Sequence, residues 1–387
     1  MKADFDRVID RRHTGCIKYD FAVEHGYPAD VLPLFIADMD FPAPECVQQA
    51  LRKAVDHGIY GYSGLMPEYY EAVQGWFSQR FGWRIEAPWI VTTPGVVFAL
   101  SAAVRAVTLP GDGVLIQPPV YGPFSKVVLD SGRKLVENKL QYENGRYTVD
   151  FDDFEEQARK VKVFLLCSPH NPVGRVWTTE ELTRMGEICQ KYQVTVVSDE
   201  IHCDFTLPGH PHTPFVKACP WWAEHTIVCT APSKTFNLAG LQVSNCIVPG
   251  KALREAFSRQ VYLTGYSELN CLGIAACQAA YTSGWEWLQA CKAYLWKSLD
   301  YVRGFLRENL PNLHLVEPEG TYFAWLDCSG VGVSPEELER RLVEVGRLRL
   351  GGDFGSSLFR RVVLLARGQR WNRPWSGWCL RWDNRVL

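Results

Sequence analysis

The sequence predicts an α/β fold in which a mostly parallel sheet lies between layers of helices, with a small α+β domain attached. The first observation is a set of six short runs rich in β-branched residues, at 89–93, 114–117, 163–167, 194–198, 226–230 and 243–248. Segments with helical periodicity, such as 95–107 and 179–192, separate several of them. Strands that alternate with helices form parallel sheets covered on both faces. The length of 387 residues and the hydrophobic content of 47% fit two domains with a large core.

Composition narrows the function classes. The formal net charge is −2, so no basic excess indicates a nucleic-acid or anionic-membrane partner. No apolar run approaches the roughly 20 residues of a membrane span, and the first residues lack the apolar core of a signal peptide. The 13 cysteines include no CxxC pair, a pattern typical of reduced thiols rather than of a zinc site or a disulfide framework. We therefore expect a cytoplasmic protein without nucleic-acid, membrane or metal partners.

Residues 1–44 are expected to form an N-terminal arm and part of the small domain. A short apolar strand spans 32–36, and a helix begins after Pro44. Asp38 lies in the turn between them, where it marks either the approach to the helix or the rim of a pocket. Tyr60 and Tyr62 follow in a loop broken by glycines. These two side chains either pack locally or reach a neighbouring site.

Residues directly after the strands are the candidates for a site, because ligands of a parallel sheet bind beyond the carboxyl ends of its strands. Gly95, Val96 and Val97 follow the first strand and open a helix, whose free amides form a cradle for an anion. The stretch contains no GxxxxGK arrangement, so a nucleotide-triphosphate loop is not supported. Tyr121 follows the second strand in a proline-rich turn and presents an aromatic face.

The next three strands are followed by an amide, a carboxylate with a histidine, and an amine. Asn171 lies between two prolines, which restrict its geometry and suit a directed hydrogen bond. Asp199 and His202 follow the fourth strand; each alone is more often a helix cap or a core histidine. Lys234 follows the fifth strand. It is either a surface lysine or a pocket amine with a lowered pKa that can form a Schiff base.

Together these groups match the needs of pyridoxal 5′-phosphate (PLP). This cofactor requires a phosphate cradle, a ring stack, a donor to its phenolate oxygen, an acid at its pyridine nitrogen and a lysine for its aldehyde. Asp199 would keep the pyridine nitrogen protonated, and Lys234 would link the aldehyde. A metal site at His202, His210 and His212 is the alternative for this part of the chain, but no nearby carboxylate completes it.

Five segments carry a resemblance to a known family: ADMDFP at 37–42, YGYSG at 60–64, SPHNPVGRVW at 168–177, SDEIHCDF at 198–205 and SKTFNLAGL at 233–241. They resemble the aminotransferase class I and II family of fold-type I PLP enzymes, and within it the cystathionine β-lyase branch. The likeness covers about residues 1–355. It implies the fold-type I PLP-transferase architecture and a homodimer with shared active sites.

The resemblance also implies roles for the strand-end residues. Lys234 is the cofactor lysine and general base, and Asp199 pairs with the pyridine nitrogen. Asn171, with His202, contacts the phenolate oxygen. The ring face and phosphate contacts fall to Tyr121, Gly95, Val96, Val97 and a hydroxyl from Ser233 or Thr230. Substrate contacts fall to Asp38, Tyr62 and one of Arg360 and Arg361, while Tyr60 or Tyr62 reaches the partner subunit's site.

The C-terminal end departs from the family. We expect a large PLP-binding domain at 45–274, a small domain at 275–355 and an aberrant tail at 356–387. The family continues after Phe354-Gly355 with an Arg-containing strand, a Cys-Pro-Arg motif and a helix. A second reading frame of Leu365–Trp375 permits that motif, which indicates a frameshift between Gly355 and Leu365. The carboxylate-binding Arg should lie in this region, so its loss would weaken substrate binding.

The predicted activity is that of a PLP-dependent carbon–sulfur β-lyase in methionine biosynthesis. The substrate would be L-cystathionine or a related cysteine S-conjugate, and the products a thiol such as homocysteine, pyruvate and ammonia. An aminotransferase that uses the same groups is the alternative within the fold. Because of the abnormal tail, a catalytically impaired or regulatory protein is the alternative outside the enzyme class.

Overall fold

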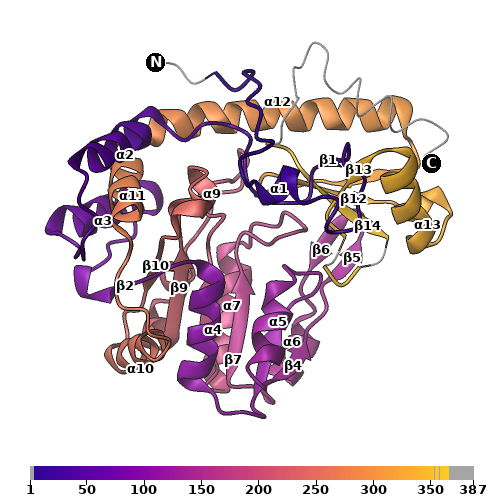
Figure 1. The fold of residues 1–387 in the computed structure, drawn as a ribbon. Helices are drawn as coiled ribbons and strands as arrows, with labels where there is room; N and C mark the ends of the chain where they lie inside the picture. The colour runs from indigo at the N-terminus through magenta and orange to yellow at the C-terminus, as the bar shows by residue number, and fades with distance from the viewer. Residues whose placement is uncertain (1–3, 353, 357, 366–387) are drawn as a thin grey trace.

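The computed structural model describes residues 4–352, 354–356 and 358–365. Within these ranges a seven-stranded sheet forms the centre of the larger body (Figure 1). All neighbouring strands pair in parallel except β10, which is antiparallel to both of its neighbours. This arrangement confirms the predicted α/β class. The spatial order of the sheet is β2 (Ile90–Thr93), β10 (Ser244–Ile247), β9 (Thr226–Thr230), β8 (Thr195–Asp199), β7 (Val163–Cys167), β3 (Gly113–Ile116) and β4 (Lys134–Glu137).

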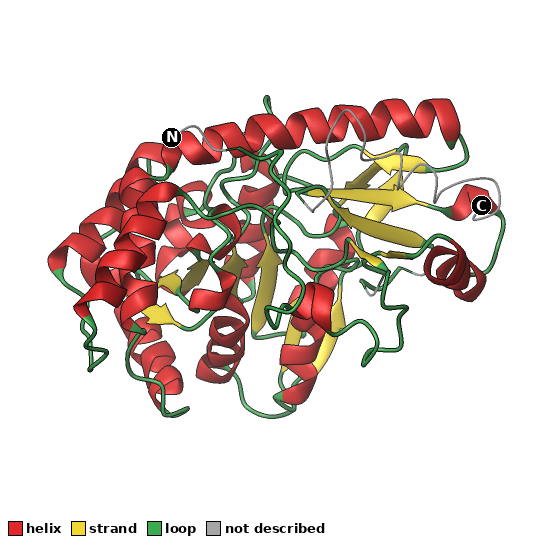
Figure 2. Ribbon diagram, turned by 45° about the horizontal axis from the view of Figure 1, so that its top comes forward, coloured by secondary structure: helices red, strands yellow, loops and turns green. Residues whose placement is uncertain are grey.

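Helices cover both faces of this sheet, as Figure 2 shows. Strand β7 illustrates why, because its side chains alternate between two separate cores. Val163, Leu165 and Cys167 pack with helices α4 (Val96–Val107), α5 (Pro123–Asp130) and α10 (Lys251–Tyr262). Phe164 and Leu166 pack with α6 (Phe151–Ala158) and α7 (Thr179–Lys191). A strand buried on both faces needs a continuous apolar sequence, which is the pattern that identified it.

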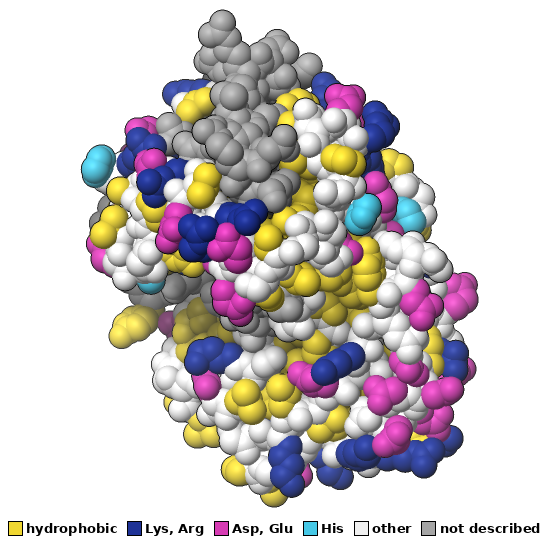
Figure 3. Space-filling model, turned by 90° about the vertical axis from the view of Figure 1, so that its right-hand side faces the viewer, with side chains coloured by type: hydrophobic (Ala, Val, Ile, Leu, Met, Phe, Trp, Pro, Cys, Tyr) yellow, Lys and Arg dark blue, Asp and Glu magenta, His cyan; other side chains and the backbone are white. Residues whose placement is uncertain are grey.

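A third core joins the small domain to the N- and C-terminal parts of the large one. Helix α12 (Trp285–Asn309) spans the molecule along one edge (Figure 1). The small sheet has the order β11 (His314–Val316), β12 (Phe323–Asp327), β14 (Phe359–Val363). In the space-filling view, the surface is hollowed between the upper and lower halves of the molecule (Figure 3). Helices α2 (Glu45–His57), α3 (Pro67–Phe81) and α11 (Cys271–Ser283) also contribute buried residues to this core.

Shorter elements complete the chain. The N-terminal arm contributes β1 (Leu32–Pro33), which pairs in parallel with β13 (Leu348–Arg349) of the small domain. Helix α13 (Pro335–Arg340) is followed directly by a π-helical turn at Arg341–Val345. No helix in the described part of the chain is long and apolar enough to span a membrane. The other short elements are α1 (Ile17–Asp20), β5 (Gln141–Glu143), β6 (Arg146–Thr148), α8 (Phe215–Ala218) and α9 (Pro232–Thr235).

The C-terminal end differs from the sequence expectation of a tail that starts at residue 356. Strand β14 pairs antiparallel with β12 over five residues. Residues 362–365 are buried in the core of the small domain. Their apolar character explains this placement, since a β-branched and leucine-rich run completes the buried face of the sheet. The stretch 366–387, which holds most of the alternative-frame motif, lies outside the described residues.

Candidate active site

A cavity of about 450 Å³ lies at the carboxyl ends of the parallel strands. It collects side chains and amides that the sequence places after five different strands, because parallel strands deliver their C-terminal ends to one edge of a sheet. Nine of the predicted site residues line it: Gly95, Val96, Val97, Tyr121, Asn171, Asp199, His202, Ser233 and Lys234. Ala37 of the N-terminal arm and Gln242 complete part of the wall.

One end of the cavity is formed by the N-terminus of helix α4. Gly95 is the N-cap residue, and no side chain caps this end of the helix. The amides of Val96 and Val97 therefore face the cavity wall without a side-chain acceptor. A Cβ atom added at Gly95 would meet no atom within 4 Å, so the space beside it is open. Free amides and the positive end of the helix dipole together suit a phosphate group.

A second polar group of the cavity is Asp199, which is buried at the end of β8. Its Oδ1 accepts a hydrogen bond from the amide of Ile201 at 3.1 Å. Burial raises the pKa of this carboxyl to about 7. A carboxylate in such surroundings gains stability when a cation is placed beside it. Asp199 is therefore suited to hold a protonated ring nitrogen.

Lys234 also lines the cavity and belongs to the short helix α9 that follows β9. Its Nζ donates a hydrogen bond to the carbonyl oxygen of Ala37 at 2.7 Å. Burial, followed by the positive charge of Arg361, lowers the pKa of this amine to about 8, while Asp38 and Asp199 oppose the shift. A partly neutral amine in a pocket can act as a nucleophile and as a general base. Of the two interpretations open for Lys234, the structure supports the pocket amine.

Arg361 and Arg360 are neighbours on β14 and point in different directions, as adjacent residues of a strand must. The Nη1 atom of Arg361 donates to Oδ1 of Asn171 at 3.0 Å, which brings the guanidinium to the cavity. Burial lowers the pKa of Arg361 to about 10. Arg360 instead places its Nε 3.3 Å from Oε2 of Glu339, away from the cavity. Of the two candidate arginines, Arg361 is thus the one placed to bind a substrate carboxylate.

Aromatic groups set the environment of His202 and Tyr121. The buried ring of His202 meets the rings of Tyr322 and Phe323 edge-on, with centroids 5.4 and 5.3 Å apart. Burial lowers the pKa of His202 far below its usual range, so the ring is neutral and can donate one N–H. Its Nδ1 has no hydrogen-bond partner among the described residues. Burial also raises the pKa of Tyr121, which keeps that phenol protonated.

Six predicted residues are not among those that line this cavity: Asp38, Tyr60, Tyr62, Thr230, Arg360 and Arg361. Thr230 is buried in the sheet and donates its hydroxyl to the carbonyl of Asn245 at 2.8 Å, whereas Ser233 lines the cavity, so of the two candidate hydroxyls the structure favours Ser233. Tyr60 and Tyr62 lie on the surface, 58% and 102% exposed. Their predicted contact with a partner subunit stays a prediction.

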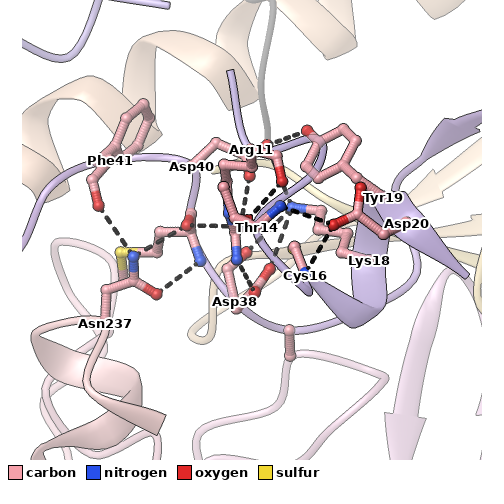
Figure 4. A network of polar contacts seen from close by, with 12 residues as sticks. Arg11, Thr14, Cys16, Lys18, Tyr19, Asp20, Asp38, Asp40, Phe41 and Asn237 are labelled. Carbon is pink, nitrogen blue, oxygen red and sulfur yellow. Dashed lines mark hydrogen bonds and ion pairs between the residues drawn. The ribbon is translucent and has the colours of Figure 1, made fainter. Parts of the chain in front are cut away.

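A buried ionic network holds the segment that carries Ala37, and the sequence did not reveal it (Figure 4). Arg11 bridges Asp38 and Asp40, each at 2.7 Å. Lys18 lies 3.3 and 3.2 Å from the same two carboxylates. The side chain of Lys18 is 0% exposed and that of Asp40 1%. Asp38, predicted as a substrate contact, is therefore engaged with the N-terminal arm at the rim of the site.

Asn237 fixes the same segment from the side of Lys234. Its Nδ2 donates to the carbonyls of Met39 and Phe41, each at 2.9 Å, and its Oδ1 accepts from the amide of Met39 at 3.0 Å (Figure 4). Asn237 is three residues beyond Lys234. The signal that could have found this network is the pair of acids after an apolar strand, since buried carboxylates require partners.

The donor set fits PLP. A flat anionic molecule with an aldehyde and a basic ring nitrogen would meet the amides of α4, the amine of Lys234 and the carboxyl of Asp199. The unpartnered Nδ1 of buried His202 and the open space beside Gly95 leave polar capacity for such a ligand. For a metal ion the described residues offer no group of three or more ligands. His212 instead lies with its Nε2 2.9 Å from Glu200.

Comparisons with known proteins agree with this geometry. The family model "Aminotransferase class I and II" matches residues 29–352. The chain is 42% identical over 349 residues to cystathionine β-lyase PatB of Bacillus subtilis, covering 90% of each chain. It is similar to the structure of cystalysin from Treponema denticola, which contains PLP (TM-score 0.94, 35% identity, 98% and 99% covered). A PLP-bound C–S lyase from Staphylococcus hominis gives a TM-score of 0.90 at 31% identity, with 98% of both chains covered.

We expect Asp40→Asn to destabilise the protein, because it leaves the buried ammonium of Lys18 with one carboxylate fewer. The free energy of unfolding should fall by about 2 to 3 kcal/mol in urea denaturation. The control is Glu45→Gln, which breaks the exposed pair with Arg52 and should cost less than about 1 kcal/mol. Equal effects of the two substitutions would show that the Lys18 network does not hold the segment.

The lowered pKa of Lys234 can be measured directly in protein without added cofactor. Because the neutral amine is the reactive form, its rate of acetylation should rise with pH around a midpoint of about 8. An ordinary lysine amine would show a midpoint near 10.4. Competitive labelling with isotopic acetic anhydride, read by mass spectrometry of the Lys234 peptide, gives the value. A midpoint above about 10 would contradict the described environment.

Proposed function

Because the chain belongs to the aminotransferase class I and II family, we propose that it is a PLP-dependent carbon–sulfur β-lyase. Its substrate is L-cystathionine or a related cysteine S-conjugate, and its products are a thiol, pyruvate and ammonia. The observation that carries the proposal is the placement of Lys234 in one cavity with Asp199 and the free amides of α4. The relatives with lyase names support the reaction type.

Different residues of the cavity would contact different parts of the cofactor. Val96, Val97 and Ser233 would hold its phosphate, and Tyr121 would cover one face of its ring. Asn171 and His202 would contact its phenolic oxygen, Asp199 its ring nitrogen and Lys234 its aldehyde. When bound, PLP supplies an electron sink that acidifies the α-proton of an amino acid.

The residues of the chain perform the remaining steps. Arg361 binds the substrate α-carboxylate with a guanidinium that has no carboxylate partner among the described residues. Lys234, once displaced by the substrate amine, takes the α-proton as general base, and a pKa of about 8 suits this role near neutral pH. The carbonyl of Ala37 holds the freed amine. The β-thiolate then leaves with the C–S electron pair, and hydrolysis of the released enamine gives pyruvate and ammonia.

An aminotransferase is the second candidate, since it requires the same groups. Gln242 lines the cavity and favours the lyase, because the family resemblance implies that transaminases carry at this position an arginine that contacts the phosphate. Incubation with cystathionine distinguishes the two activities. A lyase releases pyruvate and free thiol without any keto-acid acceptor, whereas an aminotransferase forms product only when an acceptor is added.

We predict that Lys234→Ala abolishes turnover, because it removes both the cofactor link and the base. A loss of at least about 1,000-fold in kcat is expected. The measurement is pyruvate release from cystathionine, with bound cofactor checked by its visible absorbance. A variant that retains the full rate would overturn the assignment of Lys234.

We further propose a cytoplasmic homodimer that acts in methionine biosynthesis, with Tyr60 completing the partner subunit's site. The exposure of Tyr60 and Tyr62 supports a contact outside the single chain. Lys234→Ala and Tyr60→Ala chains should each be impaired alone. Mixed dimers should recover roughly a quarter of the wild-type rate, because half of the dimers then contain one intact site. No recovery on mixing would place Tyr60 in its own chain's site or outside catalysis.

A further inference from the structure

We propose that this protein selects amino-acid substrates with a second, distal carboxylate, which Arg349 binds while Arg361 binds the α-carboxylate. The inference rests on the proposed lyase function and narrows its substrate class. It concerns a second cavity, of about 1040 Å³, that adjoins the Lys234 cavity. Tyr121 lines both cavities, and Arg361 lines the second while it is hydrogen-bonded to Asn171 in the first.

Phe35 brings the two arginines together. Its carbonyl oxygen accepts a hydrogen bond from Nη2 of Arg361. Its ring lies beneath the guanidinium of Arg349, whose Cζ is 3.7 Å from the ring centroid. The ring of Tyr27 lies 3.8 Å from the same Cζ. Contacts with two aromatic rings restrict the orientation of the Arg349 guanidinium before any ligand arrives.

Some charged side chains around the second cavity have a partner of opposite charge within the described part of the chain, and others do not. Nζ of Lys126 lies 2.8 Å from Asp130, and Arg360 is paired with Glu339. No carboxylate among the described residues pairs with Arg349 or Arg361. A partly buried guanidinium without an anion is a preorganised carboxylate site, because its planar fork matches the two oxygens. The cavity therefore offers two such sites, one at each end of a bound molecule.

The chemistry of the substrate follows from this pair. An amino acid held at Arg361 by its α-carboxylate directs its sulfur side chain away from that end. A thioether tail that ends in a carboxylate can reach Arg349, whereas an alkyl tail leaves Arg349 without an anion. We therefore expect dicarboxylic thioethers, the chemical class that includes cystathionine, to be preferred over cysteine conjugates with uncharged tails.

The test compares two substrates of similar length on the holoenzyme, S-(3-carboxypropyl)-L-cysteine and S-butyl-L-cysteine. Arg349→Met keeps an unbranched side chain on the two rings and removes the charge. We expect kcat/KM for the acid to fall by about 10- to 100-fold in this variant. The value for the butyl conjugate should change by less than about 2-fold, which also shows that the variant is folded. Arg349→Lys should recover part of the preference.

Lys126→Met is the matched control, since Lys126 lines the same cavity but is paired with Asp130. It should leave the ratio of the two kcat/KM values unchanged. Loss of the ratio in this control as well, or an equal fall for both substrates in Arg349→Met, would overturn the role of Arg349. If neither conjugate yields pyruvate, the proposed lyase function fails instead.

A binding measurement decides the inference in that event. Calorimetric titration of the holoenzyme with adipate and with hexanoate compares two carboxylates that differ in the distal charge. Wild-type protein should bind adipate more tightly, and Arg349→Met should remove the difference. Equal affinities for the two acids in wild-type protein would refute a distal carboxylate site.

Discussion

The buried amine of Lys234 is the constraint on which the rest of the site depends. An ammonium out of water is unfavourable, and here the environment accommodates the group by lowering its pKa to about 8. The carbonyl oxygen of Ala37 accepts a hydrogen bond from the Nζ of Lys234. That acceptor must stay in place, and the network of Arg11, Lys18 and Asp40 holds the segment to which Ala37 belongs. The N-terminal arm thus contributes to the site indirectly, because it positions the backbone carbonyl that binds Lys234.

The register of strand β14 explains why the neighbouring side chains of Arg360 and Arg361 have different partners. Both belong to a strand whose register with β12 is set by the buried run that follows. Since the side chains of a strand alternate, that register directs Arg361 toward Asn171 and Arg360 toward Glu339. A shift of one residue would exchange them. The position of Arg361 next to Asn171 therefore depends on the small sheet being completed by residues 359–363.

Much of the fold could be predicted because its signal is local. The runs at 163–167 and 226–230 coincide with β7 and β9, since a strand buried on both faces must be continuously apolar. The strand-end residues followed from topology, as parallel strands present their ends at one edge. The choice between Thr230 and Ser233 could not be made from the sequence, because a sequence does not show which side chains form hydrogen bonds across the sheet, as Thr230 does with Asn245.

The sequence alone was enough to predict which chemical group follows each strand. These groups are an anion cradle at Gly95, an amide at Asn171, a carboxylate at Asp199 and an amine at Lys234. Each lies in a short stretch whose composition specifies its own turn or helix start. Three features could be seen only in the tertiary structure. They are which arginine reaches the site, which contacts hold the segment of Ala37, and the position of Arg349 beside two aromatic rings. The positions of the two arginines depend on contacts between segments more than 300 residues apart, such as Arg361 with Phe35, and Ala37 is held partly by Asn237, 198 residues from Met39. Such contacts follow from packing and register, which no local pattern encodes.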